Sequence, residues 1–138
     1  MSTTKITITT TASASPKKVW EYWTLPKHIV NWNFASNDWH CPRSENDLRV
    51  GGKMNSRMEA KDGSFGFDFE AVYDEVIDLK KITYSMADGR QASTLFEAVG
   101  DKTKITTTFD AENTHPLEMQ KNGWLAILNN FKNYVEGN

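Results

Sequence analysis

The stretch SFGFDFEAVY, residues 64–73, constrains the fold more than any other part of the chain. Aromatic and small apolar side chains occupy every second position in it: Phe65, Phe67, Phe69, Ala71 and Tyr73. A period of two is typical of a β-strand with one buried face. The sequence therefore predicts a strand whose inner face is a row of rings. These rings either fill a core or line a chamber that holds a ligand.

Strand patterns surround this segment. An alternating strand comes first, at Lys5–Thr10, and from Phe34 to Asp110 the chain reads as about six strands. Glycine-containing turns such as Gly51–Gly52 and Asp62–Gly63 separate them, which favours an antiparallel meander. The segment Asn37–Arg49 contains Pro42, so we expect it at a sheet edge or a bulge.

Helical patterns occupy the two ends of the meander. Ser15 and Pro16 begin a helix that we expect to end near Leu25, because the next residue is proline. A second short helix should begin at Pro26 and bury Ile29 and Trp32. The last 25 residues contain the longest helix, which we expect to be capped at or beside Thr114 and to stop at Gly137. Its apolar stripe consists of Trp124, Ile127, Leu128, Phe131 and Val135.

This order of elements predicts an α+β fold. A curved antiparallel sheet of six to seven strands would close over the long C-terminal helix, with two short helices after the first strand. The length of 138 residues suits one domain spanning 1–138.

Composition excludes several classes of function. Sixteen basic residues against 18 acidic ones give a net charge of −2, and no run of five like charges occurs, so we expect no nucleic-acid partner. The single cysteine, Cys41, cannot form an internal disulfide. The N-terminus lacks the apolar core of a signal peptide, and no segment has the ~18–20 apolar residues that cross a bilayer. We therefore expect a cytoplasmic protein that has no membrane partner.

Cofactor motifs are also missing from the sequence. His28, His40 and His115 are far apart and have no metal-ligand spacing. His40 and Cys41 are neighbours on a predicted strand, so their side chains should face opposite ways. The segment around Gly51–Gly52 lacks the rest of a phosphate-binding loop. We expect no metal and no cofactor.

Four segments in order carry a resemblance to a known family: SPKKVWEYWTLPKHIVNW from Ser15, DLRVGGK from Asp47, FEAVYDEV from Phe69 and NGWLAILNNFKNYV from Asn122. The chain resembles the START-like helix-grip (SRPBCC) superfamily, within it the group related to the activator of Hsp90 ATPase and to polyketide cyclases. The family often has glycine where Ala71 stands. The resemblance implies a helix-grip fold in which a space remains between sheet and helix.

A pocket in that space is expected to have an apolar and aromatic lining. We predict that the ligand contacts Trp32, Trp39, Met54, Phe67, Phe69, Tyr73, Tyr84, Trp124 and Leu128. Met54, Met58, Met86 and Met119 either line this pocket or belong to the core. Candidates for polar groups at its mouth are His40, Asn55, Arg57 and Tyr84. Gly123 lies inside the long helix, so it either packs closely against Trp39 or Phe96 or faces a ligand-sized gap.

Three functions remain open at this point. The first is a protein that binds a hydrophobic or aromatic small molecule, as a monomer or homodimer. The second is a cyclase or aromatase, whose only evident acid or base groups are His40, Glu59 and Tyr84. The third, which the resemblance implies, is a chaperone-ATPase activator that acts through its outer surface. We favour the first, because no catalytic constellation is evident.

Overall fold

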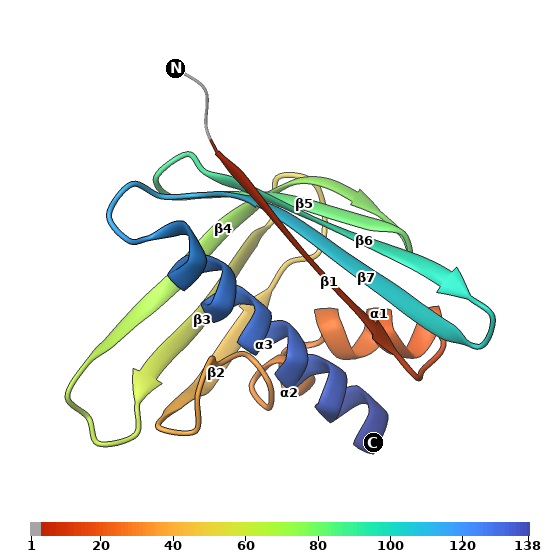
Figure 1. The fold of residues 1–138 in the computed structure, drawn as a ribbon, viewed down its shortest axis with the longest axis horizontal. Coiled ribbons are helices and arrows are strands. Elements are labelled where there is room, and N and C mark those ends of the chain that lie inside the picture. Colours follow the sequence, from red (N-terminus) through yellow and green to blue (C-terminus); the bar gives the residue numbers. More distant parts are fainter. Residues whose placement is uncertain (1–3) are drawn as a thin grey trace.

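The computed structural model describes residues 4–138, which form one curved sheet and three helices. Figure 1 shows the sheet curling around the long C-terminal helix, with the two short helices at one end. The elements follow the predicted order: β1 (Lys5–Ala12), α1 (Pro16–Thr24), α2 (Pro26–Ile29), β2 (Trp39–Asn46), β3 (Lys53–Ala60), β4 (Gly66–Ile77), β5 (Lys81–Met86), β6 (Gln91–Val99), β7 (Lys102–Asp110) and α3 (Leu117–Gly137). The α+β fold and its helix-grip arrangement are confirmed.

The sheet has seven strands in the order β1-β7-β6-β5-β4-β3-β2, and every neighbouring pair is antiparallel. β2 is an edge strand, and its pairing with β3 shifts register between His40 and Arg43. The irregularity predicted around Pro42 is therefore confirmed, since a proline cannot donate a ladder hydrogen bond.

The turns form where glycine permits them. Gly51 and Gly63 both have positive φ angles, of +82° and +79°. Arg49 forms an ion pair with Asp47 at 2.9 Å beside the first of these turns. The backbone of the Gly51–Gly52 turn bonds back to Tyr73 of β4, so this loop is part of the frame around the sheet.

The short helices begin and end as their sequence predicts. The Ser15 side chain accepts a hydrogen bond from the Lys18 backbone N–H at the start of α1, and Leu25 is its C-cap. Ile29 and Trp32 are buried at and just after α2. No helix within residues 4–138 combines the length and apolar character that crossing a bilayer requires.

The start of α3 differs from the prediction. Thr114 is not its cap: Pro116 occupies that position, and no side chain caps the helix. Gln120 instead reaches back from the first turn, where its amide nitrogen donates to the Glu112 and His115 carbonyl oxygens at 3.1 and 2.8 Å. This contact ties the preceding loop to the helix.

The core lies where α3 packs along β1 and against α1, rather than across the centre of the sheet. Leu128, Phe131 and Val135 are at most 2% exposed there. No comparable packing joins α3 to β3, β4 or β5. The middle of the concave face is therefore covered only in part.

Candidate functional site

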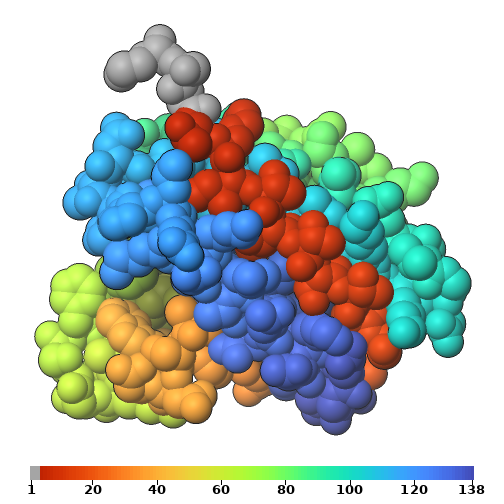
Figure 2. All heavy atoms as spheres, viewed as in Figure 1, coloured from red at the N-terminus to blue at the C-terminus, as the bar shows by residue number. Residues whose placement is uncertain are grey.

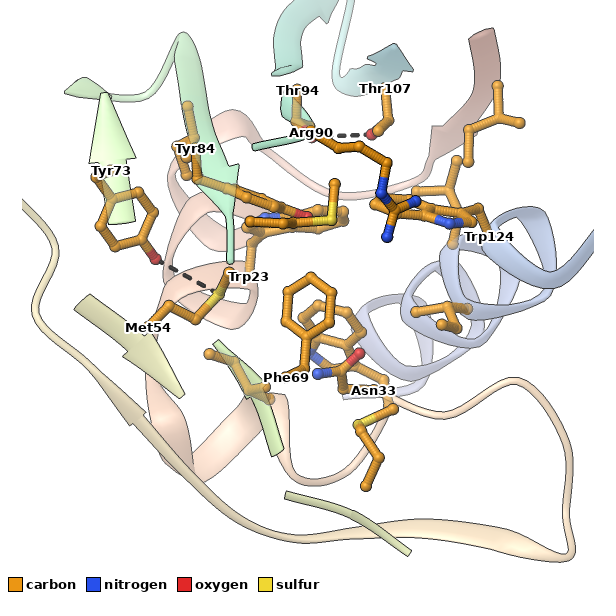
Figure 3. Close-up of a pocket in the computed structure, with 18 of the residues that line it drawn as sticks. Trp23, Asn33, Met54, Phe69, Tyr73, Tyr84, Arg90, Thr94, Thr107 and Trp124 are labelled. Atoms are coloured by element: carbon orange, nitrogen blue, oxygen red, sulfur yellow. Dashed lines mark hydrogen bonds between the residues drawn. The ribbon is translucent and has the colours of Figure 1, made fainter. Parts of the chain in front are cut away.

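A pocket of about 360 Å³ occupies this space between the concave face of the sheet and α3. Figure 3 shows side chains from both layers pointing into it. Most of its wall is apolar. It is lined by Ile8, Trp23, Ile29, Trp32, Asn33, Met54, Met58, Phe67, Phe69, Tyr73, Ile82, Tyr84, Met86, Arg90, Thr94, Thr107, Trp124, Ile127 and Leu128.

The aromatic row on β4 runs from the rim of the pocket to its floor. Phe67 is 42% exposed, Phe69 is half-buried and Tyr73 is only 4% exposed. Phe65 was expected to share this inner face, but it precedes β4, is 61% exposed and does not line the pocket. Its ring meets Trp39 and Phe67, at 6.0 and 6.2 Å between centroids.

The rings of α3 pack on elements other than β4. Trp124 stacks on Phe109 of β7, with centroids 4.0 Å apart and planes 8° apart. Phe131 meets Trp23 and Trp32 at 4.8 and 5.0 Å. The rings of helix and strand therefore do not interlock, and the space between them stays open.

The size of this space limits what it contains. An empty, rigid cavity costs about 24 cal/mol per Å³, so 360 Å³ left dry would cost about 9 kcal/mol as an upper figure. That approaches the whole stability of a small domain, about 5–15 kcal/mol. Water or a ligand must therefore occupy the pocket. In Figure 2 the surface is hollowed where the yellow-green β3–β4 hairpin, the orange segment after α2 and the light-blue segment before α3 meet.

Two tyrosines that pair across β4 and β5 differ in their hydrogen bonding. The Tyr73 hydroxyl donates to the Asn46 side-chain oxygen, and the Asn46 amide donates to the Thr24 carbonyl oxygen at 2.6 Å. Burial raises the pKa of Tyr73 to about 12, although the bond to Asn46 opposes this shift. Tyr73 is thus held within the protein frame.

Tyr84 has no such partner among residues 4–138. Within those residues no fully buried side-chain nitrogen or oxygen lacks a hydrogen bond, so its hydroxyl must retain accessible surface, and that surface lies in the pocket. Burial raises the pKa of Tyr84, the Tyr73 ring raises it further, and the Arg90 charge lowers it. Its hydroxyl therefore stays protonated and free to bond.

Among the lining residues within 4–138, Arg90 is the one that carries a positive charge, and no sequence pattern pointed to it. It follows the turn between β5 and β6, where its Nε donates to the Asp88 carboxylate at 2.7 Å. The segment ADGR indicated only a turn. The side chain after this turn points into the concave face because the sheet is curved. No local sequence pattern shows that curvature.

Three further polar side chains line the wall. Thr94 and Thr107 bond to each other at 2.9 Å across β6 and β7, so each satisfies the other. Asn33 lies at the rim, after α2. No aspartate, glutamate or histidine is among the described lining residues.

Eight of the nine predicted contact residues line the pocket, and Trp39 does not. Trp39 begins β2 and packs outside the pocket against Phe65 and Phe67, at 6.0 and 6.1 Å. It pairs with Ala60, the last residue of β3, whereas the pocket lining on β3 ends at Met58. That any of these residues contacts a ligand stays a prediction. Met58 and Met86 also line the pocket, whereas Met119 is 60% exposed and lies outside it.

The polar candidates on β2 and β3 lie on the outer face. Arg57 bonds to Glu59 at 2.8 Å, and Asn55 bonds to Glu70 at 3.1 Å. His40 lies 3.6 Å from Glu59 on the same outer face. In β3 the alternate residues, Met54 and Met58, face the pocket instead. Of the groups proposed for its mouth or for catalysis, only Tyr84 lines it.

One of the two interpretations of Gly123 was close packing against Trp39 or Phe96, and the structure does not show this packing. A Cβ atom built at Gly123 would have no neighbour within 4 Å. Phe96 packs instead on Trp20 and Trp23, at 5.4 and 5.6 Å. Open space adjoins the helix at this residue.

The family comparison covers nearly the whole chain. Residues 13–136 match the family described as Activator of Hsp90 ATPase homolog 1-like protein. The chain belongs to this family. No curated protein matches it.

Solved structures agree with this assignment. The solution structure of the AHSA1-like protein from Aeromonas hydrophila has 41% identity and a TM-score of 0.92, over 97% of this chain and 93% of that one. Chr148 from Cytophaga hutchinsonii has 48% identity and a TM-score of 0.84, over 96% and 92%. Protein CV1439 from Chromobacterium violaceum shares the fold, with a TM-score of 0.85 at 20% identity over 96% of each chain.

Proposed function

We propose that this AHSA1-like domain binds a hydrophobic or aromatic small molecule between its sheet and α3. The observation that carries the proposal is the pocket of about 360 Å³, whose walls come from the sheet, α3 and the segment around α2. Its volume falls within the range of small-molecule sites, about 300–1,000 Å³. Its lining is largely apolar, with few polar groups, as such sites require.

The aromatic residues supply the contact area. Phe69 and Tyr84 meet edge to face at 6.1 Å, and Trp23 and Trp32 form a second pair at 5.0 Å. An aromatic ligand between such pairs gains about 0.5–1.5 kcal/mol per ring contact beyond the burial of its surface. Flexible methionines next to them adapt to ligands of different shape.

Binding has more support than catalysis. A cyclase reaction needs a general acid or base with a pKa near the working pH. Among the lining residues within 4–138, the possible acid–base groups are two tyrosines, whose pKa values burial raises, and the only other charged or ionisable group is the Arg90 guanidinium. No residue in this set is a base at neutral pH. For an activator of a chaperone ATPase, no specific surface feature provides support.

The neutral dye N-phenyl-1-naphthylamine tests the proposal, because its fluorescence rises in an apolar site. We expect a saturable increase with one site per chain. Phe69→Ala should weaken binding about five- to thirtyfold, the equivalent of about 1–2 kcal/mol. Phe65→Ala is the matched control, since Phe65 lies on the same hairpin but outside the pocket, and it should change the affinity less than about twofold.

Each result has a clear meaning. No saturable binding to the wild-type protein would refute the proposal. Equal losses in the two variants would place the dye on the exposed hairpin rather than in the pocket. Denaturant unfolding of both variants shows that the folded state is retained under the conditions of the titration.

A further inference from the structure

One end of the pocket is polar, and Arg90 defines it. The Arg90 backbone is fixed on both sides: its N–H donates to Asp88 at 3.1 Å, and its carbonyl oxygen accepts from Met86 at 2.7 Å. Its side chain is 27% exposed, less than most surface arginines. Figure 3 shows the guanidinium group directed toward the pocket, on the side of Trp124.

The hydrogen bond to Asp88 uses only one of the five N–H donors of this guanidinium. Nε donates to the carboxylate, and the two terminal NH₂ groups have no partner among residues 4–138. Asp88 thus orients the side chain and leaves its outer edge available. Asp110, the other carboxylate near Arg90, is engaged by Lys5 at 2.6 Å and by the Gln91 N–H at 3.0 Å.

Tyr84 provides a second donor to the same space. Its hydroxyl has no hydrogen-bond partner among the described residues, and it lines the pocket together with Arg90. Because this hydroxyl keeps accessible surface in the pocket, water or a ligand can accept its hydrogen bond.

We infer that the ligand of this pocket is an acidic amphiphile: an apolar or aromatic body that carries a carboxylate or a similar anionic oxygen group, bound by the Arg90 guanidinium and the Tyr84 hydroxyl. This inference rests on the proposed function. An anionic group receives charge-assisted hydrogen bonds from both donors, and such bonds are roughly twice as strong as neutral ones. No described lining residue carries a negative charge that would repel it.

Two ligands of equal size distinguish the contribution of the acidic group to affinity from that of the apolar ring system. 2-Naphthoate and 2-naphthamide have the same ring system and the same number of heavy atoms, but only the first is an anion at pH 7. Quenching of the tryptophan fluorescence, with isothermal calorimetry as a second readout, gives both dissociation constants. We expect the wild-type protein to bind naphthoate about tenfold more tightly than naphthamide.

Variants assign this preference to the two residues. Arg90→Gln should reduce it to less than about twofold by weakening naphthoate alone, whereas Arg90→Lys should keep part of it. Tyr84→Phe should weaken naphthoate about threefold or more without changing the shape of the wall. Arg43→Gln is the control: that arginine is 62% exposed on β2, does not line the pocket, and should leave both constants unchanged.

The outcomes separate the two claims. Equal binding of naphthoate and naphthamide by the wild-type protein would overturn the inference and leave the proposed function standing. A preference that survives in Arg90→Gln would also overturn it, because another group would then hold the acid. Binding of neither naphthalene, together with no binding of N-phenyl-1-naphthylamine, would refute the proposed function itself.

Discussion

The same substitution at two tyrosines that face each other across neighbouring strands should have different effects on stability. Tyr73→Phe removes a hydroxyl that donates to Asn46, whereas Tyr84→Phe removes one that has no hydrogen-bond partner among residues 4–138. The two residues face each other across β4 and β5 and carry the same ring, and Tyr73 is the more buried of the two, at 4% exposed. The main difference between them is the hydrogen bond that the Tyr73 hydroxyl donates to Asn46.

The expected magnitudes follow from the bonding. Losing the Tyr73 bond costs about 1 kcal/mol, and leaving the Asn46 oxygen without its donor adds about 1 kcal/mol or more. Tyr73→Phe should therefore lower the free energy of unfolding by about 2 kcal/mol. Tyr84→Phe should leave it nearly unchanged, because the Tyr84 hydroxyl keeps accessible surface in the pocket and bonds to no group among residues 4–138.

Urea unfolding followed by tryptophan fluorescence measures both values, and an unchanged m-value shows that the unfolded state is comparable. At about 4 °C per kcal/mol, the melting temperatures of the two variants should differ by about 8 °C or more. Equal destabilisation by the two substitutions would refute the reasoning, since it would mean that Tyr84 also has a structural partner.

Three further predictions concern the frame of the pocket. Gly123→Ala should raise the free energy of unfolding by about 0.5–1 kcal/mol, since the added Cβ meets nothing within 4 Å. Gly52→Ala should lower it by about 2–3 kcal/mol, because the added Cβ would lie 2.1 Å from the Asp47 backbone oxygen. A loss of stability in both variants would contradict this account. Through Tyr73, unfolding should become easier by about 2 kcal/mol as pH rises from about 10 to about 12, because the unfolded chain releases the Tyr73 proton near its ordinary pKa and the folded chain near 12. Tyr84, whose pKa burial also raises, adds to the loss of stability over this range. Tyr73→Phe should therefore reduce the slope in pH-dependent denaturant titrations without abolishing it, and an unchanged slope would exclude Tyr73 as a source. Ser15→Ala should cost about 1 kcal/mol in thermal unfolding through loss of the α1 cap, and no loss would mean that the cap contributes nothing.

Much of the fold was predictable because its signals are local. Alternation marks the strands, Gly63 and its fellow turn glycines mark the hairpins, and Ser15 with Pro16 marks the start of α1. The cap of α3 was not predictable in this way, because Gln120 replaces a capping side chain by reaching back to a loop. That contact depends on how the loop folds, not on a residue at the cap position.

The candidate site was predictable only in part. Most of the predicted lining residues lie on the inner face of β4 and on the apolar stripe of α3. The spacing of apolar residues along the sequence is enough to place these side chains on one face. Trp39 was misplaced because it pairs with Ala60 at the end of β3, beyond the residues of β3 that line the pocket, and local periodicity does not show where along a strand a pocket ends. Arg90 was missed because a charged side chain after a turn ordinarily faces water. Its inward direction depends on the curvature of the sheet and on the bond to Asp88.

Methyl NMR of the methionines tests the central claim most directly. Three of them, Met54, Met58 and Met86, line the pocket, whereas Met119 is 60% exposed outside it and serves as an internal reference. The protein is labelled with ¹³C at the methionine methyl groups and titrated with N-phenyl-1-naphthylamine. Saturable shifts at Met54, Met58 and Met86, with Met119 unchanged, are the predicted result. Shifts confined to Met119, or none that saturate, would contradict a ligand site between sheet and helix.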